Sequence, residues 1–232
     1  MIDLASERLG GAVLYANDEF FAPKENLLKT GAPIFIEGKY TDLGKWMDGW
    51  ETRRKRAANL DRLFDWCLIR LGLPGRIRGV VVDTSFFRGN YPSHCSIEAC
   101  AVGGAPLVEE LTGLSIQWRE ILPKSELQGD SRLKFAIEEA GPATHLRFKI
   151  YPDGGVARLR VYGEVCSDRE RLIRRQSQVD LAAVENGGMV VASSDMFFGH
   201  RHNLIMPGLA ANMSDGWETK RRRGPGHDWV II

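Results

Sequence analysis

The strongest constraint on the fold of this chain is an internal repeat. The segment DGWETRRKR at residues 48–56 returns as DGWETKRRR at residues 215–223. The first five residues are unchanged, and the basic run that follows differs only by exchange of Lys and Arg. A match of this length that includes Trp rarely arises by chance, so the sequence predicts a duplicated structural unit.

Further matched pairs lie on both sides of this motif. They are Asp18-Glu-Phe-Phe with Asp195-Met-Phe-Phe, Asn26-Leu-Leu with Asn203-Leu-Ile, and Asp65-Trp66 with Asp228-Trp229. The separation between partners shortens along the chain, so the second copy is predicted to have shorter loops. A His at position 227 precedes the second Asp-Trp pair, where the first copy has Phe64. His227 either marks the working copy or is incidental.

The repeat divides the chain into three regions. Residues 1–166 are predicted to form the first repeat, a complete β-sandwich. Residues 167–188 form a linker with a short helix over residues 167–177, capped by Ser167. Residues 189–232 form the N-terminal part of a second repeat. Little sequence follows its motif, so the sequence predicts an incomplete second repeat, as in a truncated or frameshifted product or a fragment.

Composition excludes several classes of protein. The chain has 232 residues, 44% hydrophobic content and a net charge of +1. This content is typical of a soluble globular protein, and no apolar run approaches the ~20 residues that span a membrane. The N-terminus lacks the apolar stretch of a signal peptide, so we expect a cytosolic protein without a membrane partner. The balanced charge argues against a dedicated nucleic-acid binder.

The cysteines do not suggest a metal centre. Cys67, Cys95, Cys100 and Cys166 form no CxxC pair, and a cytosolic chain most simply buries them as small apolar residues. A zinc site needs tighter clustering of ligands. No metal or cofactor is predicted, and a divalent metal acting as a Lewis acid stays an alternative.

Hydrophobic alternation predicts an all-β fold. The candidate strands cover residues 32–37, 65–72, 77–83, 95–100, 115–122, 145–151 and 157–163. The last two flank Pro152-Asp-Gly-Gly, which has the composition of a turn, so they are predicted to form a hairpin. Many short strands with Gly, Pro, Asn and Asp turns indicate a jelly-roll β-sandwich.

The repeated motif carries the residue types of a small-molecule site. Asp48 and Glu51 can accept N–H bonds from a ureido group or act as a general base. Arg53 and Arg54 can hold a carboxylate through two hydrogen bonds, and Trp50 can supply a flat wall. The alternative is a solvated charged loop whose Trp fills the core. The basic run is more often ion-paired than phosphate-binding.

A second polar cluster follows the β-branched run at residues 80–82. Asp83, Thr84 and Asn90 can bind an amide-like ligand or simply brace a loop. His94 lies close by in the sequence, and a loop His of this kind is usually only exposed.

Together these residues resemble the allantoicase (allantoate amidinohydrolase) family. The resemblance covers essentially the whole chain. It includes DLASERLGG from Asp3, FFAPKENLL from Phe20, GKYTDLGKWMDGWETRR from Gly38, Asp83-Thr-Ser, Gly89-Asn-Tyr-Pro, Thr144-His-Leu-Arg, Tyr151-Pro-Asp-Gly-Gly and the second DGWET. Family members carry a complete second repeat, whereas this sequence ends soon after its second motif.

The resemblance implies tandem jelly-roll repeats similar to galactose-binding domains. It implies hydrolysis of allantoate to ureidoglycolate and urea in allantoin and purine degradation, by a cytosolic homo-oligomer. On this basis Glu51 and Asp48 are the candidate catalytic residues. Candidate substrate contacts are Arg53, Arg54, Trp50, Asp83 and Asn90, and the equivalents in the second repeat are Asp215, Glu218 and Arg221.

Two rival classes remain. A non-catalytic jelly roll that binds a sugar or polar metabolite would explain the same sandwich and the same charged loop. Nucleic-acid binding through the two basic runs would show a steep salt dependence.

Limited proteolysis tests the predicted organisation. Residues after about Met189 are expected to leave open strand edges and exposed apolar side chains such as Phe197, Phe198 and Trp229. A protease is therefore expected to trim the chain back to residues 167–188, as measured by mass spectrometry of the stable product. A tail that resists the protease would contradict this expectation.

Overall fold

The structure is a computed structural model that describes residues 1–56, 59–138, 141–167, 173–174 and 178–232. The longer strands are β2 (Ala12–Ala16), β6 (Asp65–Asp83), β7 (His94–Cys100), β8 (Arg119–Glu126), β9 (Arg132–Ala136), β10 (Pro142–Tyr151) and β12 (Arg158–Val165). The short strands are β1 (Ile2–Asp3), β3 (Tyr40–Thr41), β4 (Gly44–Lys45), β5 (Trp50–Glu51), β11 (Gly155–Val156), β13 (Ala192–Ser193) and β14 (Val230–Ile231).

Helical structure is confined, among the described residues, to short segments. The α-helix α1 covers Val108–Thr112. The 3-10 turns are η1 (Glu7–Leu9), η2 (Lys24–Leu28), η3 (Leu60–Arg62), η4 (Val184–Asn186), η5 (Arg201–Ile205) and η6 (Met213–Asp215). The prediction of an all-β sandwich is confirmed.

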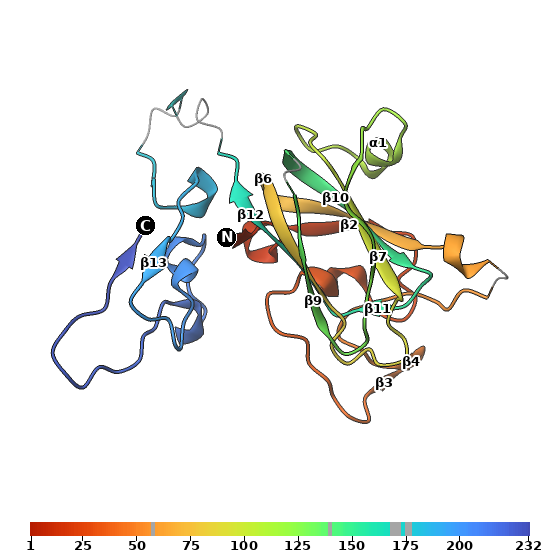
Figure 1. Cartoon of the computed structure of the whole chain (residues 1–232), viewed down its shortest axis with the longest axis horizontal. Helices are drawn as coiled ribbons and strands as arrows, with labels where there is room; N and C mark the ends of the chain where they lie inside the picture. Colours follow the sequence, from red (N-terminus) through yellow and green to blue (C-terminus); the bar gives the residue numbers. More distant parts are fainter. Residues whose placement is uncertain (57–58, 139–140, 168–172, 175–177) are drawn as a thin grey trace.

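Strand β6 joins the two sheets of the sandwich (Figure 1). On one edge β6 pairs with β2 as far as Arg70 and with β12 from Gly75 to Asp83, and β12 continues to β1. On its other edge β6 pairs with β10 as far as Arg76 and with β9 from Gly79 to Asp83, and β10 continues to β7 and β8. One long strand therefore serves both layers, because its partner on each edge changes along its length.

The core lies between these two layers. Ile69 and Phe148 contribute from the first sheet, and Val82 and Leu159 contribute from the second; all four are fully buried. Alternation along each strand places the intervening side chains outward. The core therefore follows from the same period-2 pattern that predicted the strands.

Most of the predicted strands are confirmed. Segments 65–72 and 77–83 both lie in β6, segment 95–100 lies in β7, and segment 145–151 lies in β10. The prediction that 65–72 and 77–83 are separate strands is wrong, since the chain runs through Pro74 and Gly75 without a break. In segment 115–122 the strand begins only at Arg119.

The predicted hairpin of residues 145–151 and 157–163 is wrong. Strands β10 and β12 do not pair with each other; they lie on opposite edges of β6, along parts of it that overlap only at Gly75 and Arg76. The turn at Pro152–Gly155 therefore carries the chain from one sheet to the other. Alternation reports that a strand has one buried face, but it does not report which strand lies beside it.

The strand predicted at residues 32–37 is also wrong. This segment is irregular, and Ile34, Phe35 and Ile36 are 54%, 39% and 42% exposed. The Ile34 amide donates a hydrogen bond to the Asp48 carboxylate (3.0 Å) instead of to a neighbouring strand. The Asp48 side chain thus accepts the hydrogen bond that the backbone of a neighbouring strand would accept in a sheet.

The structure also bears on the cysteines, the predicted helix and the expected absence of a membrane span. Cys67, Cys95 and Cys100 are buried free thiols and Cys166 is half-buried, as predicted. The helix predicted at residues 167–177 lies mostly outside the described residues. No helix in the described part of the chain has the length and hydropathy to cross a bilayer.

The duplication is visible in the backbone of the second region. Turn η4 ends at Gly187 with φ 95°, and turn η1 ends at Gly10 with φ 86°, a left-handed conformation that suits Gly. The bridge between Gly199 and Glu218 repeats the bridge between Ala22 and Glu51. Because the match already holds at η4, we propose that the second copy begins near residue 180 rather than residue 189.

Side-chain hydrogen bonds repeat as well. The Trp50 indole donates to the Asp18 carbonyl (2.8 Å), and the Trp217 indole donates to the Asp195 carbonyl (2.7 Å). The amides of Asn26 and Asn203 donate to the carbonyls of Gly49 and Gly216 at 2.8 and 2.9 Å. The two copies therefore share their local geometry around the motif.

The second region packs against the first through a small apolar cluster, beside the N-terminus in Figure 1. Val184, Val190 and Ile205 contact Ile2 and Leu9. The predicted exposure of Phe197, Phe198 and Trp229 is confirmed, at 60%, 60% and 43%. The second region is thus docked on one side and open on another.

Two neighbouring valines test this docking. Val190 is 2% exposed and Val191 is 55% exposed. Val190→Ala is expected to lower the free energy of unfolding by about 1–3 kcal/mol, because packing is lost, and to speed proteolysis of residues 180–232. The matched control Val191→Ala is expected to leave the cleavage rate unchanged; equal rates for the two variants would contradict the docking.

Candidate functional site

The repeated motif is held against the turn between β10 and β12. Trp50 and Glu51 form β5, which pairs with β11. Gly49 has no room for a side chain, because a Cβ there would lie 2.6 Å from the Val156 carbonyl oxygen. The Thr52 amide donates to the Gly154 carbonyl (3.1 Å), so the motif is anchored at several successive residues.

Trp50 is part of the core. Its side chain is fully buried, and its ring centroid lies 6.2 Å from that of Phe148. The sequence left open whether this Trp walls a ligand site or fills the core. The structure places it in the core, where its ring has no exposed surface to offer a ligand.

Asp48 forms a buried ion pair with Arg158. The Arg158 Nη2 lies 2.6 Å from Asp48 Oδ2, and the two side chains are only 3% and 6% exposed. Burial raises the pKa of Asp48, but hydrogen bonds from Arg158 and the Ile34 amide and the charges of Arg158 and Lys29 outweigh it, so the pKa is lowered. Asp48 therefore stays ionised and holds two segments together, which suits a positioning role.

The basic run of the motif is ion-paired, as the sequence indicated. Arg53 Nε lies 2.7 Å from Asp18, and Arg54 Nη1 lies 3.2 Å from Asp153. Arg54 also donates to the Gly89 carbonyl (2.5 Å). Both guanidinium groups brace loops, and both side chains are more than half exposed.

Glu51 differs from its neighbours in the motif because it faces a cavity. Its residue is 8% exposed, and its Oε1 accepts a hydrogen bond from Asn90 Nδ2 (2.7 Å). Burial raises the pKa of the Glu51 carboxyl, and the Asn90 hydrogen bond and the Arg54 charge only partly offset this. A buried carboxyl with a raised pKa in a cavity is suited to general acid–base chemistry.

The cavity beside Glu51, here called the Glu51 pocket, has a volume of about 420 Å³. It is lined by Phe21, Lys45, Met47, Glu51, Phe86, Arg88, Gly89 and Asn90. Lys45 and Arg88 bring positive charge to its rim, and the Arg88 side chain is 80% exposed beside Asp130. Phe86 has φ 70°, which is unusual for a non-Gly residue, and such outliers cluster at functional sites.

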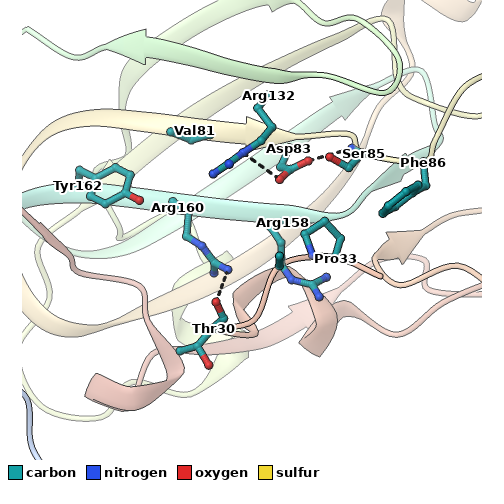
Figure 2. A pocket seen from close by; sticks show the side chains of 11 residues that line it. Thr30, Pro33, Val81, Asp83, Ser85, Phe86, Arg132, Arg158, Arg160 and Tyr162 are labelled. Carbon is teal, nitrogen blue, oxygen red and sulfur yellow. Dashed lines mark hydrogen bonds and ion pairs between the residues drawn. The ribbon is translucent and has the colours of Figure 1, made fainter. Parts of the chain in front are cut away.

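Asp83 lies in a second cavity, here called the arginine pocket, of about 440 Å³ (Figure 2). Its lining is Thr30, Ala32, Pro33, Val81, Asp83, Ser85, Phe86, Arg132, Arg158, Arg160 and Tyr162. Asp83 accepts the Ser85 amide (2.9 Å) and lies 3.3 Å from Arg132 Nε. The structure thus separates Asp83 from Glu51, and Phe86 lines both cavities.

The remaining polar candidates of the first repeat do not enter the Glu51 pocket. Thr84 Oγ1 donates to the Gln128 carbonyl (2.5 Å) and braces its loop. His94 begins β7, and its Nδ1 lies 3.0 Å from the Ser93 hydroxyl. Both arrangements fit the loop-bracing alternative that the sequence left open.

The second-repeat equivalents are less covered than the residues of the first repeat. Asp215 is half-buried, lies in η6 and accepts the Ala211 amide (2.9 Å). Glu218 and Arg221 are exposed, and so is His227. The copied motif therefore surrounds its carboxylate with protein in the first repeat and leaves it exposed in the second.

Sequence reasoning missed Arg158, Arg160 and Tyr162. These residues alternate with Leu159 and Val161 along β12, so their shared outward face was readable from the period of the strand. Lys45 gave no such signal, because its place beside Glu51 depends on how the loop before the motif folds. Among the described residues no group of three or more His, Cys, Asp or Glu has the geometry of a metal site.

Comparison with known proteins identifies the relatives of this chain. The sequence profile of the allantoicase repeat matches residues 2–166 and 179–232. The probable allantoicase 1 of Burkholderia mallei is 51% identical over 232 residues, which is 100% of this chain and 66% of that protein. The allantoicase of Dictyostelium discoideum is 50% identical over 230 residues, 99% of this chain and 60% of that protein.

A solved structure is similar over the same span. The crystal structure of allantoicase from Saccharomyces cerevisiae superposes with a TM-score of 0.77 at 38% identity, covering 99% of this chain and 66% of that one. The chain thus spans 60–66% of the length of the relatives described.

The ion pair of Asp48 gives a stability prediction. Asp48→Asn leaves Arg158 buried without a counter-charge. It is expected to lower the free energy of unfolding by about 3–5 kcal/mol at pH 7, measured by denaturant unfolding. Because the folded pKa of Asp48 is lowered, its contribution is present above the unfolded pKa of about 3.9 and is lost as pH falls through the folded value. The difference between the two proteins should therefore shrink in acid.

The control for this prediction is Asp42→Asn, which changes an exposed carboxylate in the turn between β3 and β4. It is expected to change stability by no more than about 0.5 kcal/mol. An Asp48→Asn protein as stable as the control at pH 7 would show that the pair contributes nothing.

Proposed function

Because the chain belongs to the allantoicase repeat family, we propose that it provides the activity of an allantoicase, the hydrolysis of allantoate to ureidoglycolate and urea in allantoin and purine degradation. The observation that carries the site assignment is the buried Glu51 carboxyl, hydrogen-bonded to Asn90 at the wall of the Glu51 pocket.

The groups of the Glu51 pocket complement those of allantoate. This substrate carries one carboxylate and two ureido groups on a single carbon. Lys45 and Arg88 can contact the carboxylate of the substrate. Glu51 can accept hydrogen bonds from the N–H groups of a ureido group, and Asn90 can donate one to its carbonyl oxygen. Met47 and Phe86 supply apolar walls that exclude water from part of the cavity.

Hydrolysis requires a base for water and a proton for the departing nitrogen. In the proposed reaction the Glu51 carboxylate takes a proton from water, whose oxygen bonds to the central carbon as the C–N bond breaks. The carboxyl then returns the proton to the nitrogen of urea. One water is consumed, its hydroxyl enters ureidoglycolate and its proton enters urea.

The rest of the motif positions Glu51. Asp48 and Arg158 hold the segment before it, and Trp50 holds it in the core. Arg54 lies close enough to lower the Glu51 pKa in part, so its charge adjusts the base rather than holding substrate. Arg53 braces the end of the motif through Asp18. A homo-oligomeric state and a cytosolic location also belong to this proposal, on the family resemblance alone.

Urea release from allantoate is the direct test. Glu51→Gln is expected to lower kcat by at least about 100-fold, because the amide cannot accept the proton of water. In the unchanged chain, kcat/KM should rise with pH through the pKa of Glu51, which burial places above its usual range. Wild-type turnover in Glu51→Gln would remove Glu51 from the catalytic role.

Two further variants sharpen the result. Glu25→Gln changes an exposed carboxylate paired with Lys24 and serves as the matched control. Glu218→Gln asks whether the copied motif also works; a loss there and not in Glu51→Gln would move the site to the second repeat. Allantoate binding without urea release would favour the non-catalytic binding module.

A further inference from the structure

We propose that the arginine pocket is a separate binding site for the carboxylate group of a small organic acid. It lies on the other side of Phe86 from the Glu51 pocket, and its residues come from the outward faces of β6, β9 and β12 and from the loop after η2 (Figure 2). The hydrogen-bond donors of the pocket define this site, independently of the reaction proposed for Glu51.

Arg158 lines the pocket, and each of its three guanidinium nitrogens already donates a hydrogen bond. Its Nε donates to the Gly31 carbonyl (3.0 Å), its Nη1 donates to the carbonyls of Asp48 and Ala157 (2.9 and 2.7 Å), and its Nη2 pairs with the Asp48 carboxylate. Its charge is neutralised by Asp48. Ligand binding must therefore fall to the other groups.

Three other groups present donors that remain available within the described part of the chain. Arg132 lies 3.3 Å from Asp83 at Nε, no hydrogen bond of its terminal nitrogens is seen among the described residues, and its side chain is 65% exposed. Arg160 uses Nη2 for the carbonyls of Lys29 and Thr30, while Nη1 has no partner. Tyr162 lines the pocket, and its hydroxyl has no hydrogen-bond partner among the described residues.

The acceptors of the pocket are largely used. Asp83 Oδ1 accepts the Ser85 amide, and Oδ2 faces Arg132. Asp3 lies 3.8 Å from Arg160 Nε, and its Oδ1 accepts the amides of Ala5 and Val161. Burial lowers the pKa of Arg160, and Asp3 only partly offsets this, so the guanidinium has lost water without gaining a close counter-charge. Donors exceed acceptors, and an anion is the ligand that balances them.

The shape of the pocket favours an organic acid. A guanidinium fork matches a planar carboxylate through two parallel hydrogen bonds. Pro33, Val81 and Phe86 line the cavity with apolar surface, which a carbon chain can cover and inorganic phosphate cannot. A volume of about 440 Å³ is within the range of small-molecule sites.

The probe is glycolate. Its binding is measured in NMR titrations of the full chain by the chemical-shift changes of the Ser85 and Phe86 backbone amides. Saturable shifts at both residues are expected. Arg132→Gln should weaken binding about tenfold, because it removes a charged two-bond contact. Lys134→Gln is the matched control, since Lys134 is exposed on the same strand and lies outside the pocket; it should leave the affinity unchanged.

Tyr162→Phe provides a second variant that keeps both arginines, and it should weaken glycolate several-fold. Neutral glycolamide should not bind. Glu51→Gln should bind glycolate normally, so loss of turnover and loss of this site are distinguishable. Equal weakening by Arg132→Gln and Lys134→Gln, equal binding of glycolamide, or saturation by inorganic phosphate and not by glycolate would each overturn the proposal.

Discussion

The buried contact between Asp48 and Arg158 connects the parts of the molecule that matter for ligand binding. It joins the start of the repeated motif to the first residue of β12, two segments far apart in the sequence. A bare charge could not remain at this depth, so each side chain requires the other. With the pair in place, Gly49 lies against Val156 and β5 pairs with β11. The Glu51 carboxyl is then held at the wall of its pocket.

The same contact separates the two cavities of the first repeat. Arg158 lines the arginine pocket, and Glu51, three residues after Asp48 in the sequence, lines the other cavity. Phe86, in its left-handed backbone conformation, lines both. The loop at residues 83–90 thus supplies Asp83 to one side and Asn90 to the other. Polar residues of one short loop therefore line different cavities.

The two copies of the motif show which features belong to local sequence. Both copies make the Trp-to-carbonyl hydrogen bond and the Asn-to-Gly hydrogen bond, because those contacts join residues within the repeated segment. Burial of the motif is not shared. The motif of the first copy is buried, and its Trp50 packs against Phe148 of β10. The motif of the second copy is open to solvent at Glu218. Burial by the rest of the fold raises the pKa of the Glu51 carboxyl.

The sequence by itself determined the duplication, the all-β class, most strands and the ion pairing of the basic run. The first three depend on local pattern, an exact motif or a period of two. The ion pairing was expected from the charge of the run alone, since its partners Asp18 and Asp153 lie far away in the sequence. Tertiary structure alone decided that β10 and β12 pair with opposite edges of β6 instead of with each other. It also decided that Trp50 fills the core and that Glu51 lines a cavity while Asp48 holds Arg158. It also brought Arg132, Arg160 and Tyr162 together. The physical reason is that alternation along a strand specifies which face is buried but not which strand or loop lies beside it. A pocket is lined by residues of several such elements, so it depends on their arrangement.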